Sequence, residues 1–348
     1  MNNVDRAIIA EYRKSKSVFD SIEQIVVGKI NRVIEENNIS VMDVAHRVKD
    51  EMSLQGKIGK KSGKYKSLND ITDIVGFRVI CFFSDGVDKI GTLMDELFDI
   101  DEDNSVDKRE LISATQFGYL SLHKICSLKK SDEYPDDYCS WRFEIQIRTV
   151  LQHTWAEIEH DLGYKSEFGV PRHLRREFSR IAGLLEIADE QFVSLRDNLI
   201  MYEDDIRSKI ISGDADDIAI DRISLSEYMK HNRDMVAFID RLAKESNADV
   251  EYISPESYLE QLDFLGLKTI GDLSKLLKDN GEFAYQVAME KILGVGLDIF
   301  STNLVLRYLC RCELKKSNYS EEQIRRFVSL AQFDRERIET DVKRIMEY

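Results

Sequence analysis

The chain has 348 residues, of which 43% are hydrophobic and 32% are charged, so it is long enough to bury one sizeable core and a second, smaller one. A formal net charge of −15 argues against general coating of nucleic acid, and the sequence contains no run of eighteen apolar residues that could cross a membrane. Five cysteines without CxxC spacing, and an N-terminus unlike a signal peptide, predict a reducing, cytoplasmic location.

The first 50 residues are expected to be helical. One helix is predicted to begin at Ser40, because Asp43 three residues later makes an acidic variant of a capping box. The window 47–66 then reverses the overall charge, with seven basic residues against two acidic ones. Its three glycines favour a flexible loop that becomes ordered around phosphate groups, although a solvated basic loop is the alternative.

The stretch 70–83 is predicted to contain a buried strand. After Asp73 it is an almost unbroken apolar run, which is typical of a strand with both faces covered. Arg78 interrupts this run, and an arginine inside such a strand must be paired or must open onto a polar cleft. We therefore expect a cleft beside Arg78, with Asp73 at the strand entrance as a neighbour.

Two further strands are expected to bury an aliphatic face and to keep functional groups on the other face. One covers residues 117–125, and the other covers residues 143–149. The polar positions are Tyr119, Ser121 and His123 along the first strand, and Arg142, Glu144, Gln146 and Arg148 along the second. Carboxylates can hold a cation or accept a proton and arginines can neutralise phosphate oxygens, so the pattern predicts a cleft that handles phosphate. A half-solvated antiparallel strand is the alternative.

Residues 149–162 are predicted to form a helix. Its expected core stripe is Leu151, Trp155, Ile158 and Leu162. On the far side lie His153, Glu157 and His160, at a spacing that could bind zinc. No HExxH pattern accompanies them, so a solvated helix face is the favoured interpretation.

A long amphipathic helical region is predicted after Pro171, and its opening, residues 172–180, is locally basic. Residues 206–221 are expected to be a linker between a first domain, residues 1–205, and a helical accessory domain, residues 222–348. In this last part, helices are predicted to begin at Ser254-Pro255 and at the capping box Ser320-Glu321-Glu322-Gln323.

Four motifs in this chain resemble those of the RelA/SpoT synthetase-domain family, and in particular those of the small alarmone synthetases that lack a hydrolase domain. The motifs are Asp73-Ile-Val-Gly76-Phe-Arg78, Gly118-Tyr119-Leu-Ser121-Leu-His123, Glu144-Ile-Gln146-Ile-Arg148-Thr149, and Trp155-Ala-Glu-Ile-Glu159-His160 followed by Tyr164-Lys165. They stand in the family's order over about 95 residues, which is far more specific than any one of them. The similarity covers roughly residues 15–200.

The resemblance implies an ATP-dependent enzyme that transfers the β,γ-pyrophosphate of ATP to the 3′-hydroxyl of GDP or GTP and so makes (p)ppGpp. It also implies Mg²⁺ as the cofactor. The expected fold is α/β (α+β), with a mixed β-sheet of nucleotidyltransferase-like type flanked by helices and followed by an all-helical C-terminal domain.

The family's site residues can be carried over position by position. Glu144 and Asp73 resemble the catalytic pair, with Asp73, Glu144 and Glu159 near the metal and Glu144 also accepting the hydroxyl proton. The ATP-binding positions are Arg47, Lys49, Ser53, Lys57 and Arg78. The acceptor-binding positions are Tyr119, which resembles the aromatic residue that stacks on guanine, with His123, Gln146 and Arg148.

Two alternatives remain open. One keeps the chemistry but uses the 3′ end of tRNA as the acceptor, as toxic relatives of this family do; the basic opening at 172–180 favours it, whereas Tyr119 and the acidic chain favour a free nucleotide. The other is a nucleotide-binding signalling protein without catalysis, whose C-terminal helices engage a protein partner. The chain is expected to be a homo-oligomer and to make no membrane contact.

Overall fold

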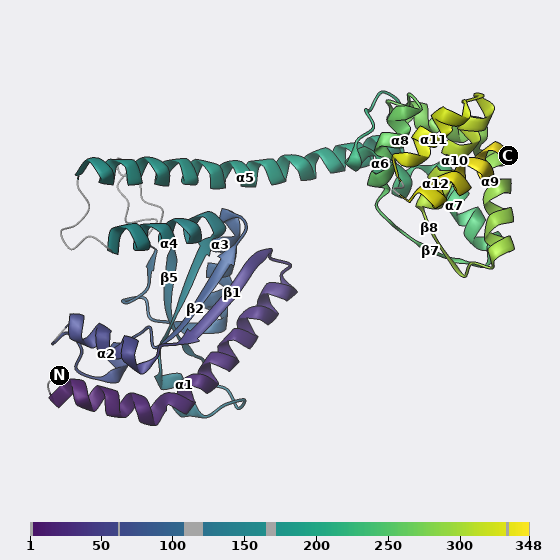
Figure 1. The fold of residues 1–348 in the computed structure, drawn as a ribbon. Helices are drawn as coiled ribbons and strands as arrows, with labels where there is room; N and C mark the ends of the chain where they lie inside the picture. Colours follow the sequence, from purple (N-terminus) through teal and green to yellow (C-terminus); the bar gives the residue numbers. More distant parts are fainter. Residues whose placement is uncertain (1–2, 62, 108–120, 165–171, 332–333, 348) are drawn as a thin grey trace. The chain divides into compact units, whose positions relative to one another are not determined.

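The computed structural model describes the chain except for residues 1–2, 62, 108–120, 165–171, 332–333 and 348 (Figure 1). It divides into two compact units, Met1–Arg196 and Asp197–Tyr348. The long helix α5 (Arg172–Ser212) supplies residues to both. Among the described helices, none combines the length and the apolar character needed to cross a membrane.

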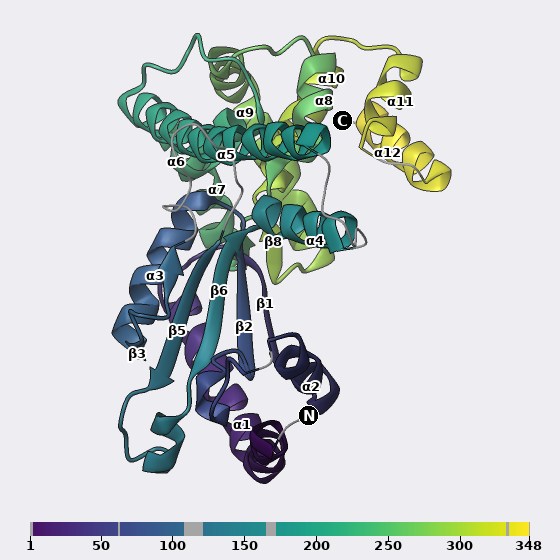
Figure 2. The same ribbon diagram turned by 90° about the vertical axis from the view of Figure 1, so that its left-hand side faces the viewer.

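Unit 1 is built on a mixed sheet whose strands run in the order β1-β2-β6-β5-β3, with β4 paired to β5 (Figure 2). The strands are β1 (Val41–Val48), β2 (Val75–Cys81), β3 (Phe98–Ile100), β4 (Val106–Asp107), β5 (Leu122–Leu128) and β6 (Phe143–Thr149). Strands β2 and β6 are parallel, and the other pairs are antiparallel. The predicted mixed sheet is therefore confirmed.

The core of unit 1 lies between the sheet and two helices, α1 (Asn3–Glu36) and α3 (Ser84–Leu97). Alternate residues of β2 and β6, including Phe77, Phe143 and Ile145, are almost fully buried in it. Because side chains alternate along a strand, the positions between them face the opposite side of the sheet. That polar side carries the candidate site.

The predicted helix at Ser40 is wrong, since residues 41–48 form the edge strand β1. Along its length β1 pairs with β2, from Val41 opposite Cys81 to Val48 opposite Val75. The capping pattern at Ser40 is a local signal, and pairing with a distant strand overrides it. Valines of β1 pack against the core of unit 1 and secure this arrangement.

The predicted flexible loop in the basic window is also wrong, because helix α2 (Glu51–Lys60) occupies its centre. Asp50 caps this helix by accepting hydrogen bonds from the Ser53 amide and hydroxyl at 2.8 and 2.7 Å. Leu54 and Ile58, one turn apart, are fully buried. Each such burial contributes about 1.5–3 kcal/mol, which outweighs the cost of about 1 kcal/mol for each helical glycine.

Helix α4 (Val150–Tyr164) confirms the helix expected after β6, but only part of its predicted core stripe is buried. Trp155 is 5% exposed and packs edge-on against Phe178 of α5. Ile158 and Leu162 are 46% and 59% exposed. The predicted core stripe is therefore right for Leu151 and Trp155 but wrong for Ile158 and Leu162, because helical spacing does not say how far a covering surface extends.

Unit 2 is rich in helices, but the prediction that it is all-helical is wrong, because β7 (Asp249–Glu251) and β8 (Ile299–Ser301) form a two-stranded parallel sheet. Its helices are α6 (Arg222–His231), α7 (Arg233–Ser246), η3 (Pro255–Tyr258), α8 (Leu259–Phe264), α9 (Ile270–Val295), α10 (Asn303–Lys316), α11 (Glu321–Ser329) and α12 (Arg335–Glu347). The predicted starts at Pro255 and Ser320 are both present.

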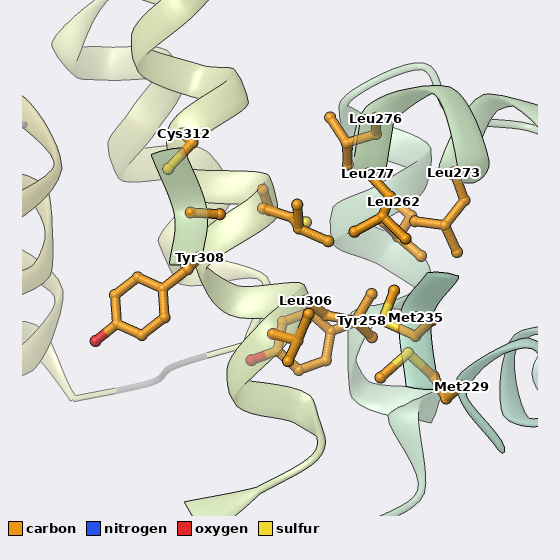
Figure 3. Close-up of a cluster of buried hydrophobic side chains, with 14 of the residues drawn as sticks. Met229, Met235, Tyr258, Leu262, Leu273, Leu276, Leu277, Leu306, Tyr308 and Cys312 are labelled. Atoms are coloured by element: carbon orange, nitrogen blue, oxygen red, sulfur yellow. The ribbon is translucent and has the colours of Figure 1, made fainter. Parts of the chain in front are cut away.

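One continuous apolar core holds unit 2 together (Figure 3). It includes Met235, Leu262, Leu273 and Leu306, which are labelled in the figure. The stretch predicted as a linker, residues 206–221, begins inside α5, and its Ile206 and Ile210 are buried in this core.

Candidate active site

A pocket of about 170 Å³ opens on the polar side of the sheet in unit 1. It is lined by Ala45, His46, Arg47, Asp73, Gly76, Phe77, Arg78, Glu144 and Gln146. The register explains this grouping, because Gly76 and Arg78 of β2 lie beside Glu144 and Gln146 of β6, respectively. On the other side of β2, Arg47 and Ala45 of β1 lie opposite the same two residues. Asp73 and Glu144 therefore share one pocket, as expected.

Two lysines hold Asp73. Lys49 Nζ lies 2.9 Å from Asp73 Oδ2, and Lys57 Nζ lies 2.6 Å from Asp73 Oδ1. Burial alone would raise the pKa of Asp73, but the hydrogen bonds and charges of Lys57 and Lys49 outweigh it and hold this pKa below its ordinary value. Asp73 is thus ionised at neutral pH.

Glu144 is held through both of its carboxylate oxygens. His123 Nδ1 lies 2.9 Å from Oε1, and Gln146 Nε2 donates to Oε2 at 2.9 Å. Burial alone would raise the pKa of Glu144, yet the hydrogen bonds from His123 and Gln146 lower it overall. On the far side of the imidazole, Ser121 Oγ lies 2.7 Å from His123 Nε2. An ionised Glu144 can only accept, so Nδ1 of His123 carries the proton.

Two arginines lie near Gln146, Arg148 two residues further along β6 and Arg78 beside it on β2. Arg148 donates to Oε1 of Gln146 through Nη2 and is only 5% exposed. Burial, together with the nearby charge of Arg78, lowers the pKa of Arg148 to about 10, so it stays cationic at neutral pH. Arg78 Nη1 lies 3.1 Å from Oε1 of Glu157 on α4, and Arg78 also lines the pocket, so this strand arginine is paired and opens onto a polar cleft, as expected.

Comparisons with known proteins identify relatives of this chain. A family model described as "Region found in RelA / SpoT proteins" matches residues 46–168. The GTP pyrophosphokinase YjbM of Bacillus subtilis is 30% identical over 167 residues, which cover 47% of this chain and 75% of YjbM. The chain belongs to the RelA/SpoT family. A second relative, the GTP pyrophosphokinase YwaC of Bacillus subtilis, is 26% identical over 189 residues, covering 53% of this chain and 87% of YwaC.

Solved structures of small alarmone synthetases also match this RelA/SpoT chain. The crystal structure of small alarmone synthetase 2 from Bacillus subtilis is 25% identical, with a TM-score of 0.45, and covers 54% of this chain and 99% of its own. Small alarmone synthetase 1 from Bacillus subtilis, bound to its product pppGpp, is 21% identical, with a TM-score of 0.45, and covers 55% of this chain and 99% of its own.

Several residues expected at the RelA/SpoT site lie elsewhere or outside the described residues. The Ser53 amide and hydroxyl donate to Asp50, the cap of helix α2, and Glu159 is exposed on α4 and does not line the pocket. Tyr119 lies outside the described residues. Arg142, on the same strand face as Glu144 in the sequence pattern, donates instead to Asp101 Oδ2 at 2.5 Å.

Two histidines near this RelA/SpoT pocket were not assigned to it from the sequence. His46 of β1 belongs to the pocket lining, but its imidazole is on the α1 side of the sheet, where Nδ1 lies 3.0 Å from Oε1 of Glu23. His153 on α4 is close to the arginines, and burial together with the charges of Arg78 and Arg148 lowers its pKa. If residues 41–48 had been predicted as a strand, the alternation of Ala45 and Arg47 would have indicated that this strand lines the pocket together with β2 and β6.

The carboxylates of this RelA/SpoT site suit a hard divalent cation. Asp73 and Glu144 offer oxygen ligands, which Mg²⁺ prefers. Within the described residues, no three His, Cys, Asp or Glu side chains gather into a complete metal site. This donor set fits Mg²⁺, which is commonly held by one or two carboxylates together with substrate phosphates.

Proposed function

We propose that this RelA/SpoT protein is an ATP-dependent 3′-pyrophosphokinase. It transfers the β,γ-pyrophosphate of ATP to the ribose 3′-hydroxyl of GDP or GTP, releasing AMP and making (p)ppGpp. The observation that carries the proposal is that Asp73 and Glu144 line one pocket beside Lys49, Lys57, Arg47 and Arg78. Two relatives named GTP pyrophosphokinase support it.

The basic side of the pocket is the proposed ATP side. Arg47 lies on β1, Lys49 follows this strand, and Lys57 lies on α2, so the three come from one short segment at the sheet edge. Arg78 of β2 adds a fourth cation. Four cations near one pocket would neutralise much of the charge of a triphosphate, and the planar guanidinium of Arg47 can stack on a base.

The acidic side of the pocket is the proposed reaction centre. Asp73 and Glu144 would hold Mg²⁺, which would offset charge on the moving phosphates. Glu144 is ionised and directed by His123 and Gln146, so it can accept the proton of the 3′-hydroxyl as that oxygen forms its bond to the β-phosphorus. The bond between the β-phosphorus and the oxygen of the α-phosphate breaks, and AMP leaves with the electron pair.

The test is a transfer assay with ATP labelled at the γ-phosphate. The protein is incubated with Mg²⁺ and with GDP, GTP or deacylated tRNA in parallel. Label in GDP or GTP supports the proposal, and label only in tRNA supports the alternative acceptor. Label in none of them would contradict both and favour a nucleotide-binding protein without catalysis.

We also propose that the chain forms a homo-oligomer. Unit 1 exposes an apolar stripe on α5, where Ile181, Leu184, Phe192 and Leu195 are between 46% and 66% exposed. Their spacing of three, eight and three residues places them on one face of the helix, a pattern typical of helix–helix pairing. Light scattering should give a mass above that of one chain, and the double substitution Leu184→Glu and Leu195→Glu should reduce it.

A further inference from the structure

The two cations nearest Asp73 create a conflict with metal binding. Both carboxylate oxygens of Asp73 already face an ammonium group, at 2.9 Å from Lys49 and 2.6 Å from Lys57. The cluster of one carboxylate and two lysines therefore has a net charge of +1. A divalent cation that approached Asp73 would be repelled by both lysines.

The fold fixes the positions of both lysines. The backbone of Lys49 is fixed on both sides, because its amide donates to Ile74 O at 2.7 Å and its carbonyl accepts from the Tyr12 hydroxyl at 2.7 Å. Lys57 lies on α2 between the buried residues Leu54 and Ile58. The side chains are only 12% and 24% exposed, so water screens these charges weakly.

We propose that Lys49 and Lys57 occupy both carboxylate oxygens of Asp73, the proposed metal ligand, until the donor nucleotide binds. The site then takes up its divalent cation only together with the phosphates of the donor. The inference rests on the proposed function, because it assigns the donor side of the pocket to a triphosphate. The phosphate oxygens compete for the two ammonium groups. The carboxylate of Asp73 is then free to bind the cation that accompanies the phosphates. Each lysine exchanges Asp73 for a phosphate oxygen as its anionic partner. Lys49 and Lys57 are thus both phosphate-binding and positioning residues.

The test measures binding of Mn²⁺ alone, without nucleotide, from the electron paramagnetic resonance signal of the free ion. Wild-type protein should bind Mn²⁺ weakly. The substitution Lys57→Met removes one competing cation, and it should tighten binding of Mn²⁺ about tenfold or more. The same substitution should weaken binding of a non-hydrolysable ATP analogue, because a phosphate partner is lost.

A matched control lies outside the pocket. Asp85 also has two cationic partners, with Lys89 at 2.7 Å and Arg196 at 2.8 Å. The substitution Lys89→Met therefore removes one lysine from a similar cluster and should leave Mn²⁺ binding unchanged. Adding Asp73→Asn to Lys57→Met should abolish the gain, which would place the bound ion at Asp73.

Three results would overturn the proposal. They are equal Mn²⁺ affinity in wild type and Lys57→Met, a gain that survives Asp73→Asn, and unchanged affinity for the ATP analogue in Lys57→Met. A failure of the proposed function would instead appear as missing product in the transfer assay. The two outcomes are distinguishable because the Mn²⁺ measurement involves no turnover.

Discussion

His123 and Glu144 lie on neighbouring antiparallel strands, and the imidazole Nδ1 of the first is 2.9 Å from a carboxylate oxygen of the second. Gln146 donates to the other carboxylate oxygen. Together these two donors fix the carboxylate plane and keep it charged. A carboxylate oriented in this way does not have to reorganise when substrate arrives. Such preorganisation of charged groups is the main source of electrostatic catalysis in enzymes.

Replacing Glu144 by glutamine should abolish pyrophosphate transfer while leaving the fold intact. An amide of the same size fills the pocket but neither accepts a proton nor holds a cation, so kcat should fall by about 10²–10⁴-fold. The measurement is transfer of labelled pyrophosphate to GDP, with circular dichroism as the check on folding. Activity close to that of wild type would remove Glu144 from both roles.

Replacing Arg148 by methionine should lower kcat/KM for the acceptor by about tenfold or more. The buried guanidinium fixes the amide of Gln146, and without it the amide can rotate away from Glu144. Steady-state kinetics with varied GDP measures this effect. The matched variant is Arg142→Met, just before the same strand, which breaks the pair with Asp101 and should lower stability much more than kcat/KM. The reverse order of effects would contradict the role of Arg148.

Replacing Asp50 by alanine should weaken ATP binding as well as stability. Asp50 caps α2, and loss of a cap costs about 1 kcal/mol. Because α2 carries Lys57, fraying of this helix should raise the dissociation constant for an ATP analogue, measured by calorimetry. Ser320→Ala removes a comparable cap from α11 in unit 2 and should cost similar stability without changing affinity. Equal loss of affinity in both variants would refute the link.

The contribution of Asp73 to stability should depend on pH. Its pKa is lower in the folded protein than in the unfolded chain, so its stabilising effect is present above the unfolded pKa and is lost as the pH falls through the folded pKa. Asp73→Asn should therefore lower the free energy of unfolding at pH 7 by about 1–3 kcal/mol. At a pH below the folded pKa of Asp73, the difference from wild type should disappear. Urea unfolding at both pH values measures it, and a constant difference would contradict the ion pairs.

The parts of the site that the sequence predicted correctly are those with a two-residue period. Strand β6 alternates buried apolar residues with Glu144, Gln146 and Arg148, so the pleat of the strand alone places the functional groups on one side. The pairing of Asp73, which precedes β2, with Glu144 came instead from the resemblance to the RelA/SpoT family, and both residues line the same pocket. In these strands the local pattern and the tertiary packing agree.

The parts that failed depend on partners distant in sequence. Residues 41–48 form a strand because β2 pairs with them, and no pattern within Ser40–Asp43 reports that partner. Ser53 is a different case, because its hydroxyl donates to Asp50, the cap of α2, only three residues earlier. Glu159 lies on a helix turn that faces solvent, because the orientation of α4 follows from its packing against Phe178 and not from its own motif.

The donor half of the pocket comes mainly from one continuous segment, since β1 and α2 follow each other directly along the edge of the sheet. The reaction centre, by contrast, depends on strands in the middle of the sheet whose residues are packed on both sides. Two residues of that segment, Lys49 and Lys57, nevertheless pair with Asp73 of the proposed reaction centre. A substitution at either lysine would therefore alter the donor side and this carboxylate at the same time, so the two halves of the pocket would have to change together.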